Sequence, residues 1–303
     1  MDKESRDYID PETYQISIVA EIGCNHKGDL KIALEMIATA ADFCNVHAVK
    51  FQKRTPKELL SSKEYNSPHP EPRNAYGNTY GEHREYLEFN IDEHQILKEA
   101  CDSRNIVYSA SVWDLTAAKE ICSLSPGFIK IPSACNLDYR MLKYICDQFG
   151  GEIHVSLGMT TKQEEDDIIT FFEKNRRAHD VVLYSCTSDY PVQFDDVCLF
   201  EITRLRQKFA NTVKHIGFSG HHLGIAVDIA AVTLGATWIE RHLTMDRTWK
   251  GTDHAASLEP GGLRKLVRDI KNVKKSLSYK SEDILPSERK QREKLKRVDY
   301  ENV

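Results

Sequence analysis

The chain has 303 residues, of which 41% are hydrophobic and 29% are charged, and its formal net charge is -5. This composition is typical of a soluble globular protein with a sizeable core, and it argues against a largely disordered chain. The negative balance argues against nucleic-acid binding, which needs clustered lysines and arginines.

The distribution of residues along the chain excludes further classes of protein. No stretch approaches the roughly 18 apolar residues of a membrane span, and the first residues contain no apolar signal segment, so we expect a cytoplasmic protein with no membrane partner. The 8 cysteines include no C-x-x-C pair, which argues for reduced thiols. Acids interrupt the basic segment 288–297, where we expect a solvated terminal helix rather than a nucleic-acid site.

Short apolar, β-rich runs recur along the chain and predict eight strands, at residues 16–22, 47–51, 106–110, 128–131, 153–157, 181–186, 215–219 and 238–243. Apolar residues at three- and four-residue spacing predict helices between them, for example at 30–42, 91–103 and 115–122. Apolar strands that alternate with amphipathic helices indicate a parallel sheet covered by helices, and eight such units close a (β/α)8 TIM barrel.

A doubly wound open sheet is the competing fold. It would carry a phosphate-binding G-x-G-x-x-G after the first strand, but in the segment EIGCNHKG at residues 21–28 one glycine follows the strand and the next is five residues away. We therefore expect the barrel at 15–285, with an N-terminal arm at 1–14 and a charged tail at 286–303.

The segment from residue 53 to residue 90 interrupts the regular spacing of the strands. It is long, polar and rich in proline, asparagine, glycine and tyrosine. Because a loop of this length in a compact domain usually covers or binds a ligand, we expect a lid or a binding loop here.

Polar residues at the carboxyl ends of the predicted strands form a set, because the active site of a barrel lies at that end. Lys50 and Lys130 each follow an apolar run, where an unpaired ammonium would be costly to bury. Serines stand at other strand ends, namely Ser133, Ser156, Ser188 and Ser219. Together they suggest a cradle for a phosphorylated carboxylate. The alternative for each lysine is a salt bridge to Glu21 or Glu240.

His221 and His242 are predicted at the ends of the last two strands, which are neighbours in a barrel. Imidazole is the commonest protein metal ligand, and no Cys/His grouping supplies the four ligands of a closed zinc site. One interpretation is an open divalent-metal site that is completed by water and substrate oxygens. The other is that each histidine is a hydrogen-bonded core residue, and the spacing alone leaves both open.

Five motifs in this order resemble the sialic acid synthase family: IVAEIGCNHKGD at 18–29, VKFQK at 49–53, TYGEH at 79–83, FSGH at 218–221 and RHLTMDRTWKGTDHAASLEP at 241–260. The resemblance implies a (β/α)8-barrel transferase that forms a C–C bond between phosphoenolpyruvate and N-acetylmannosamine, or its 6-phosphate, and releases phosphate. It also implies a requirement for manganese or magnesium. The last motif is most similar to the animal-type enzymes.

The resemblance implies roles for individual residues. His221 and His242 would hold the metal, and Glu21, Lys50 and Lys130 would act in catalysis. The candidate residues around the two substrates are Gln52, Ser133, Ser156, Ser188, Tyr190, Ser219 and Asp253. In the implied reaction, C3 of phosphoenolpyruvate attacks the aldehyde, water activated by Glu21 or by the metal adds to the product, and phosphate leaves.

Two features depart from the family pattern. Cys135 stands two residues after Ser133, where the family commonly has an acid, and a thiol is a poor substitute for a carboxylate. Family members also usually carry a C-terminal antifreeze-like domain that reaches across a homodimer and supplies an arginine to the sugar site. The chain stops at Val303, too soon for that domain. By resemblance we expect a homodimer. The missing arginine could be replaced by Arg73, by Arg84 or by a separate protein, or it could have no replacement.

Three functions remain open at this point. The first is synthesis of N-acetylneuraminate or a related nonulosonate. The second is a barrel synthase or aldolase that acts on a different aldehyde, which Cys135 and the missing C-terminal domain would allow. The third is a non-catalytic partner subunit, but a decaying site would lose its histidines or lysines early, and here both kinds of residue are present.

Overall fold

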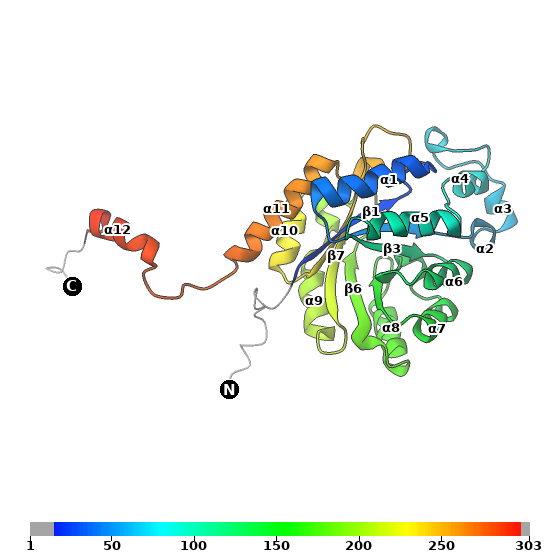
Figure 1. Ribbon diagram of the computed structural model, residues 1–303. Coiled ribbons are helices and arrows are strands. Elements are labelled where there is room, and N and C mark those ends of the chain that lie inside the picture. Colours follow the sequence, from blue (N-terminus) through cyan, green and yellow to red (C-terminus); the bar gives the residue numbers. More distant parts are fainter. Residues whose placement is uncertain (1–14, 298–303) are drawn as a thin grey trace.

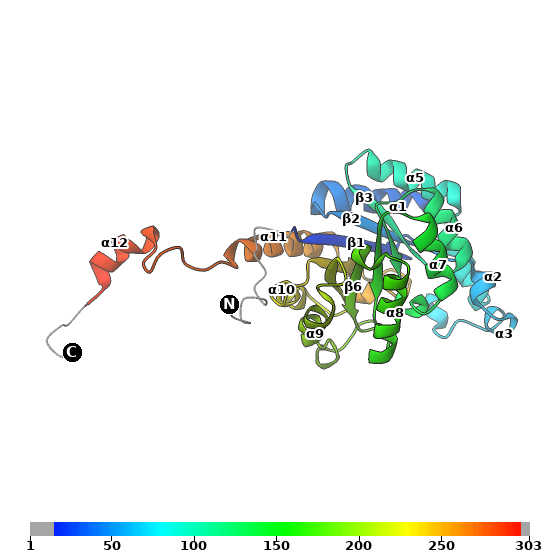
Figure 2. The same ribbon diagram turned by 90° about the horizontal axis from the view of Figure 1, so that it is seen from below.

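The structure, a computed structural model, describes residues 15–297. Its parallel strands close into a barrel in sequence order, and β1 pairs with β8. Figures 1 and 2 show the barrel surrounded by helices. The strands are β1 (Ser17–Gly23), β2 (Ala48–Lys53), β3 (Val107–Val112), β4 (Phe128–Ile131), β5 (Glu152–Ser156), β6 (Val181–Cys186), β7 (His215–Gly220) and β8 (Trp238–His242). The predicted (β/α)8 barrel is confirmed.

Helices follow the strands and cover the barrel. They are α1 (Leu30–Ala38), the π-helical η2 (Thr39–Cys44), α5 (Ile91–Asp102), α6 (Leu115–Ser123), α7 (Tyr139–Gln148), α8 (Lys162–Lys174), α9 (Phe200–Phe209), α10 (Ala226–Thr233) and α11 (Pro260–Ser276). Five of them begin at a side chain that accepts hydrogen bonds from the first turn: Asp29, Asn90, Asp114, Asp138 and Thr161. The helix predicted at 30–42 is thus α-helical only as far as Ala38, where it continues as a π-helix.

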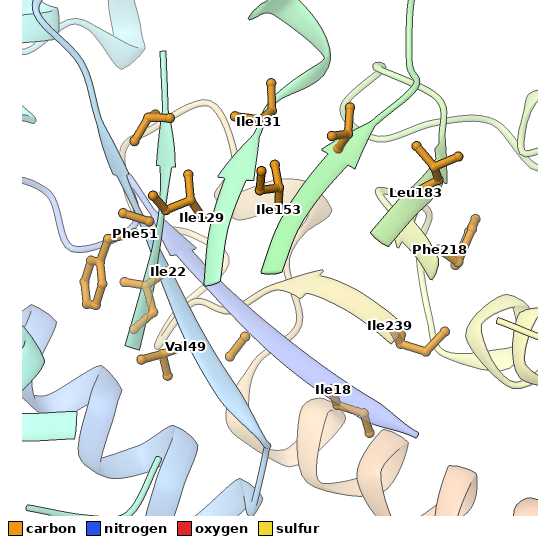
Figure 3. Packing of buried hydrophobic residues seen from close by; sticks show 14 of the residues in the cluster. Ile18, Ile22, Val49, Phe51, Ile129, Ile131, Ile153, Leu183, Phe218 and Ile239 are labelled. Carbon is orange, nitrogen blue, oxygen red and sulfur yellow. The ribbon is translucent and has the colours of Figure 1, made fainter. Parts of the chain in front are cut away.

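Alternate residues of each strand face the helices and the barrel interior, because successive side chains of a strand point to opposite sides. Residues such as Ile18 and Val49 pack against the helices in one continuous core (Figure 3). A separate cluster lies inside the barrel and consists of Val19, Ala48, Phe128, Val182, Tyr184 and Trp238. The buried polar side chains of Glu21, Lys50 and Lys130 each lie two residues further along the strand than a member of this cluster. A packed apolar floor therefore underlies a charged barrel mouth.

The segment between β2 and α5, residues 54–90, is called the β2 loop below. The sequence predicts a lid or a binding loop there and does not predict the helices that it contains. The structure has the short helices α2 (Pro56–Leu59), α3 (Ser62–Tyr65), η3 (Pro72–Asn74) and α4 (Tyr80–Tyr86). Capping boxes begin α3 and α4: Ser61 pairs with Glu64, and Thr79 pairs with Glu82. These reciprocal hydrogen bonds stabilise helices that are too short to be recognised from their composition.

The C-terminal helix α12 (Pro286–Leu295) is exposed along its whole length and lies apart from the barrel in both views (Figures 1 and 2). The expectation of a solvated helix in this basic region is confirmed. The predicted arm at 1–14 lies outside the described residues, as do the last residues of the tail, 298–303. Within residues 15–297, no helix is both long enough and apolar enough to cross a membrane.

Two buried histidines link the stability of the barrel to pH. His154 stacks on Phe128 in the floor, with ring centroids 3.9 Å apart, and its Nδ1 lies 2.9 Å from the Tyr184 hydroxyl oxygen. Burial lowers the pKa of His154 to about 4. Burial also lowers the pKa of His94, whose Nδ1 lies 2.7 Å from the Tyr108 hydroxyl oxygen, to about 3. Both rings are therefore neutral in the folded chain at neutral pH.

We expect the free energy of unfolding to fall as the pH drops from 6.5 towards 4, because only the unfolded chain takes up protons on these histidines in that window. Each histidine should contribute on the order of 3 kcal/mol to the change. Chemical denaturation of the wild type and of His154→Gln at pH 7.5 and pH 5 measures it. The exposed His179 provides the matched control His179→Gln. If the free energy of unfolding fell by the same amount between pH 7.5 and pH 5 in the wild type and in His154→Gln, His154 would not be a source of the pH dependence.

Candidate active site

A cavity of about 350 Å3 opens at the carboxyl ends of the strands. The residues that the sequence proposed for catalysis, substrate binding and the metal all line it: Glu21, Lys50, Gln52, Lys130, Ser133, Ser156, Ser188, Tyr190, Ser219, His221, His242 and Asp253. Most of these residues lie on strands, and the others lie in the loops that follow β4, β6, β7 and β8. The structure thus brings the whole predicted set into one site, because all eight strands end at the same rim.

Two lysines and two glutamates form a buried charge network at the bottom of this cavity. Lys50 makes an ion pair with Glu21 and lies 3.6 Å from the Glu240 carboxylate. Lys130 lies 3.0 Å from the other oxygen of Glu240. Ser219 donates a hydrogen bond to Glu240, and Ser111 accepts one from Lys50. The network is electrically balanced, so the salt-bridge interpretation of the lysines is correct, and both lysines also face the cavity.

The network shifts the pKa values of its members in directions that burial and pairing explain. Burial raises the pKa of Glu21, although the neighbouring Lys50 opposes this. Burial also acts to raise the pKa of Glu240, but the attraction of Lys130 and Lys50 is larger and holds it below its usual range. Burial lowers the pKa of Lys130 against the opposing effect of Glu240. Glu21 is therefore the carboxylate of the pair that more readily accepts a proton.

His221 and His242 lie side by side at the rim, with ring centroids 5.4 Å apart. His221 Nδ1 lies 2.9 Å from the carbonyl oxygen of Thr187, which fixes the tautomer and leaves Nε2 as the acceptor. Burial lowers the pKa of His221 to about 3, so the ring is neutral. His242 Nδ1 is buried without a hydrogen-bond partner, and it lies 3.7 Å from the Asp253 carboxylate.

These two buried imidazoles fit a divalent metal that takes its remaining ligands from water and substrate. Within residues 15–297, no group of three or more His, Cys, Asp or Glu side chains is arranged to hold a metal ion. A closed structural site built from protein ligands alone is therefore not formed by the described residues.

A buried network supports the loop that carries His221. Arg241 of β8 donates to the Asp228 carboxylate of α10 at 2.5 Å, to the carbonyl oxygen of His222 at 2.7 Å and to that of Gly224 at 2.8 Å. Arg241 and Asp228 are both fully buried. The loop after β7 is thus held to β8, which also carries His242.

Several residues of the cavity were missed by the sequence-based prediction or considered only as alternatives. Glu240 was considered only as a salt-bridge partner, although it lies two residues before His242 and therefore on the same face of β8. The β2 loop contributes a further group, of which the sequence offered only the TYGEH motif and Arg84: Arg54, His69, Tyr80, His83 and Arg84. Of the two arginines proposed from this loop, only Arg84 lines the cavity. Arg73 is exposed and pairs with Glu71 at 2.8 Å.

Cys135 does not line the main cavity. It lines a neighbouring pocket of about 190 Å3 that is also lined by Leu59, Leu60 and Trp113. Its thiol lies 3.1 Å from the carbonyl oxygen of Trp113, and burial raises the pKa of Cys135 to about 12. The thiol stays protonated at neutral pH and so supplies no anion in place of the acid that the family commonly has.

Replacing a carboxylate by its amide should lower the free energy of unfolding more at Glu240, inside the charge network, than at Asp147 on the surface. Glu240→Gln removes the carboxylate shared by two buried lysines and should lower the free energy of unfolding by on the order of 3 kcal/mol. Asp147→Asn removes one member of the exposed Lys143–Asp147 pair and should cost less than about 0.5 kcal/mol. Urea denaturation of both variants tests the comparison. Equal, small losses would mean that Glu240 does not stabilise the lysines.

The chain was compared with known proteins. The profile of the NeuB family matches residues 36–282. Human N-acetylneuraminate-9-phosphate synthase is 37% identical over 281 residues, which are 92% of this chain and 76% of the human protein. The N,N'-diacetyllegionaminic acid synthase of Campylobacter jejuni is 33% identical over 261 residues, 86% of this chain and 77% of that protein.

A solved structure agrees with the sequence matches. The crystal structure of N-acetylneuraminic acid (sialic acid) synthetase from Leptospira borgpetersenii, in complex with citrate, superposes with a TM-score of 0.77 at 30% identity. The superposition covers 94% of this chain and 93% of that one. The chain is therefore an enzyme of the NeuB family, the sialic acid synthase family whose motifs it shares.

Proposed function

We propose that this enzyme condenses phosphoenolpyruvate with N-acetylmannosamine, or its 6-phosphate, to form a sialic acid or its 9-phosphate, with release of inorganic phosphate. One observation carries the proposal: a single cavity gathers two buried lysines, the strand-end serines and two buried histidines. The names of the relatives support a nonulosonate product.

The lysines and serines suit phosphoenolpyruvate, which carries both a phosphate and a carboxylate. In the structure, Lys50 and Lys130 are neutralised by Glu21 and Glu240. An anionic ligand would compete with these carboxylates for the ammonium groups, while Ser133, Ser156 and Ser219 offer hydroxyl donors along the same wall. Binding would thus exchange one set of charge pairs for another without exposing the lysines to water.

Manganese or magnesium would be held by His221 and His242, and when bound it supplies a Lewis acid for the aldehyde oxygen of the sugar. The neutral tautomer of His221, fixed by the Thr187 carbonyl oxygen, suits this role. Asp253, which lies near His242, is proposed to bind the sugar hydroxyls.

Glu21 is proposed as the general base. In the first step C3 of phosphoenolpyruvate forms a bond to the aldehyde carbon, whose oxygen takes up a proton. In the second, water adds to C2 as Glu21 removes its proton, and phosphate leaves with cleavage of the C–O bond. The Glu21 carboxylate accepts a hydrogen bond from the Gln52 amide at 3.1 Å and pairs with Lys50, so its position is defined from two sides. The cytoplasmic location stays a prediction from the sequence, and the homodimer stays a prediction from the resemblance.

Phosphate release from phosphoenolpyruvate tests the proposed reaction. With manganese present, we expect release that depends on an added amino sugar, stops on treatment with EDTA and returns when manganese or magnesium is restored. His221→Ala should lose this activity, because one imidazole cannot replace two as metal ligands, and its melting temperature should show that it is folded. Sugar-dependent release that is unaffected by EDTA would contradict the metal site.

Replacing the proposed base tests the second step. Glu21→Gln should lower kcat by at least about 100-fold, because it removes the proton acceptor but keeps the side chain's shape. Isothermal titration should still detect phosphoenolpyruvate binding. The exposed Glu173 provides the control Glu173→Gln, which should match the wild type. Unchanged turnover in Glu21→Gln would remove Glu21 from the mechanism.

A further inference from the structure

Arg241 lies behind the cavity, on the side of β8 that faces the helices. Its neighbours Glu240 and His242 both line the cavity, and successive side chains of a strand point to opposite sides. Arg241 itself does not line the cavity, and its side chain is fully buried. It can therefore influence the site only through the residues that it holds in place.

Arg241 binds the loop that joins β7 to α10. Its guanidinium donates to the carbonyl oxygens of His222 and Gly224, which stand one and three residues after His221. The same guanidinium pairs with the buried carboxylate of Asp228 in the first turn of α10. One side chain of β8 is thus bonded to both the loop and the helix that follows it.

The loop has little local structure that could fix its path. Five other covering helices begin at a side chain that accepts hydrogen bonds from the first turn, but α10 begins at Ile225, whose side chain makes no such bond. Gly224 has a φ of +77°, a backbone conformation that glycine adopts without strain. The contacts with β8 therefore matter more here than at the start of the other five helices.

The bonds of Arg241 connect the backbones that carry the two imidazoles. Arg241 directly precedes His242, and its partner His222 directly follows His221. On its other side His221 is held by the loop after β6, because its carbonyl oxygen accepts the backbone N–H of Val192 at 3.2 Å. Two ligands that are already in place bind a metal more tightly than two that must first be ordered.

We propose that the clamp, defined as Arg241 with Asp228, sets the separation of His221 and His242 and thereby determines the affinity of the site for a divalent cation. Arg241 is then a positioning residue that touches neither substrate nor metal. The inference rests on the metal site of the proposed function and assigns to the clamp a role that is separate from the stability of the barrel.

Titration calorimetry with manganese tests the clamp in the double variant Arg241→Met/Asp228→Leu. This variant removes both charges together, so that no unpaired charge stays in the interior, and it should fold. It cannot donate to the carbonyl oxygens of the loop. We expect the Kd for manganese to rise about 10- to 100-fold. The Kd for phosphoenolpyruvate, measured without metal, should be unchanged, because the clamp does not contact Lys50 or Lys130.

A similar arginine elsewhere in the barrel provides the matched control. Arg177 pairs with Asp180 and donates to three carbonyl oxygens near the amino end of β5, those of Cys146, Phe149 and Gly151. None of these residues lines the cavity. Arg177→Met/Asp180→Leu should therefore bind manganese as the wild type does.

A second variant keeps the test decisive if melting curves show that the double variant is unfolded. Arg241→Lys retains the positive charge beside Asp228 but replaces the planar fork of donors by a single nitrogen. It should fold and still raise the Kd for manganese, by less than the double variant would.

The inference would be overturned by a folded clamp variant with the manganese affinity of the wild type, by an equal loss of affinity in the control, or by a wild type that binds no manganese. A parallel loss of phosphoenolpyruvate affinity would also overturn it, because that would indicate general damage to the site. If manganese affinity falls as expected but the wild type releases no phosphate with any amino sugar, the clamp stands and the proposed reaction is wrong.

Discussion

The site depends on burying four charges together at the mouth of the barrel. A lone ammonium or carboxylate at this depth would be costly, and here each lysine has a glutamate within salt-bridge distance. Glu240 contacts both lysines, so it connects β2, β4 and β8 across the barrel. The network therefore sets the positions of the side chains that would receive an anionic substrate, and it does so before any ligand binds.

The apolar floor and the loops determine how far this network is removed from water. Phe128, Tyr184 and Trp238 fill the barrel below the charges. The Lys130 ammonium lies 3.3 Å from the centre of the Tyr184 ring. Above, the β2 loop is joined to the loop after β8, because the Tyr76 hydroxyl donates to the carbonyl oxygen of Lys250 at 2.5 Å. Segments that are far apart in the sequence thus enclose one cavity.

The departure at Cys135 has a structural meaning that the family comparison alone would not provide. The thiol lies outside the main cavity and stays protonated, so it takes no direct part in the charge balance of the site. The acids that line this cavity are Glu21, Glu240 and Asp253.

The order of strands and helices was determined by the sequence itself, because buried parallel strands need continuous apolar runs and their covering helices need amphipathic ones. The strand-end residues, including Lys50, Lys130 and His242, could be predicted as one site because a closed barrel brings all its strand ends to one rim. Only the tertiary structure decided which charges pair, why Glu240 serves two lysines, where Cys135 points and which β2-loop side chains reach the cavity. Sequence spacing gives the strand and the face of a residue. Pairing across the barrel and the path of a long loop depend on distances between segments that are not neighbours in the chain.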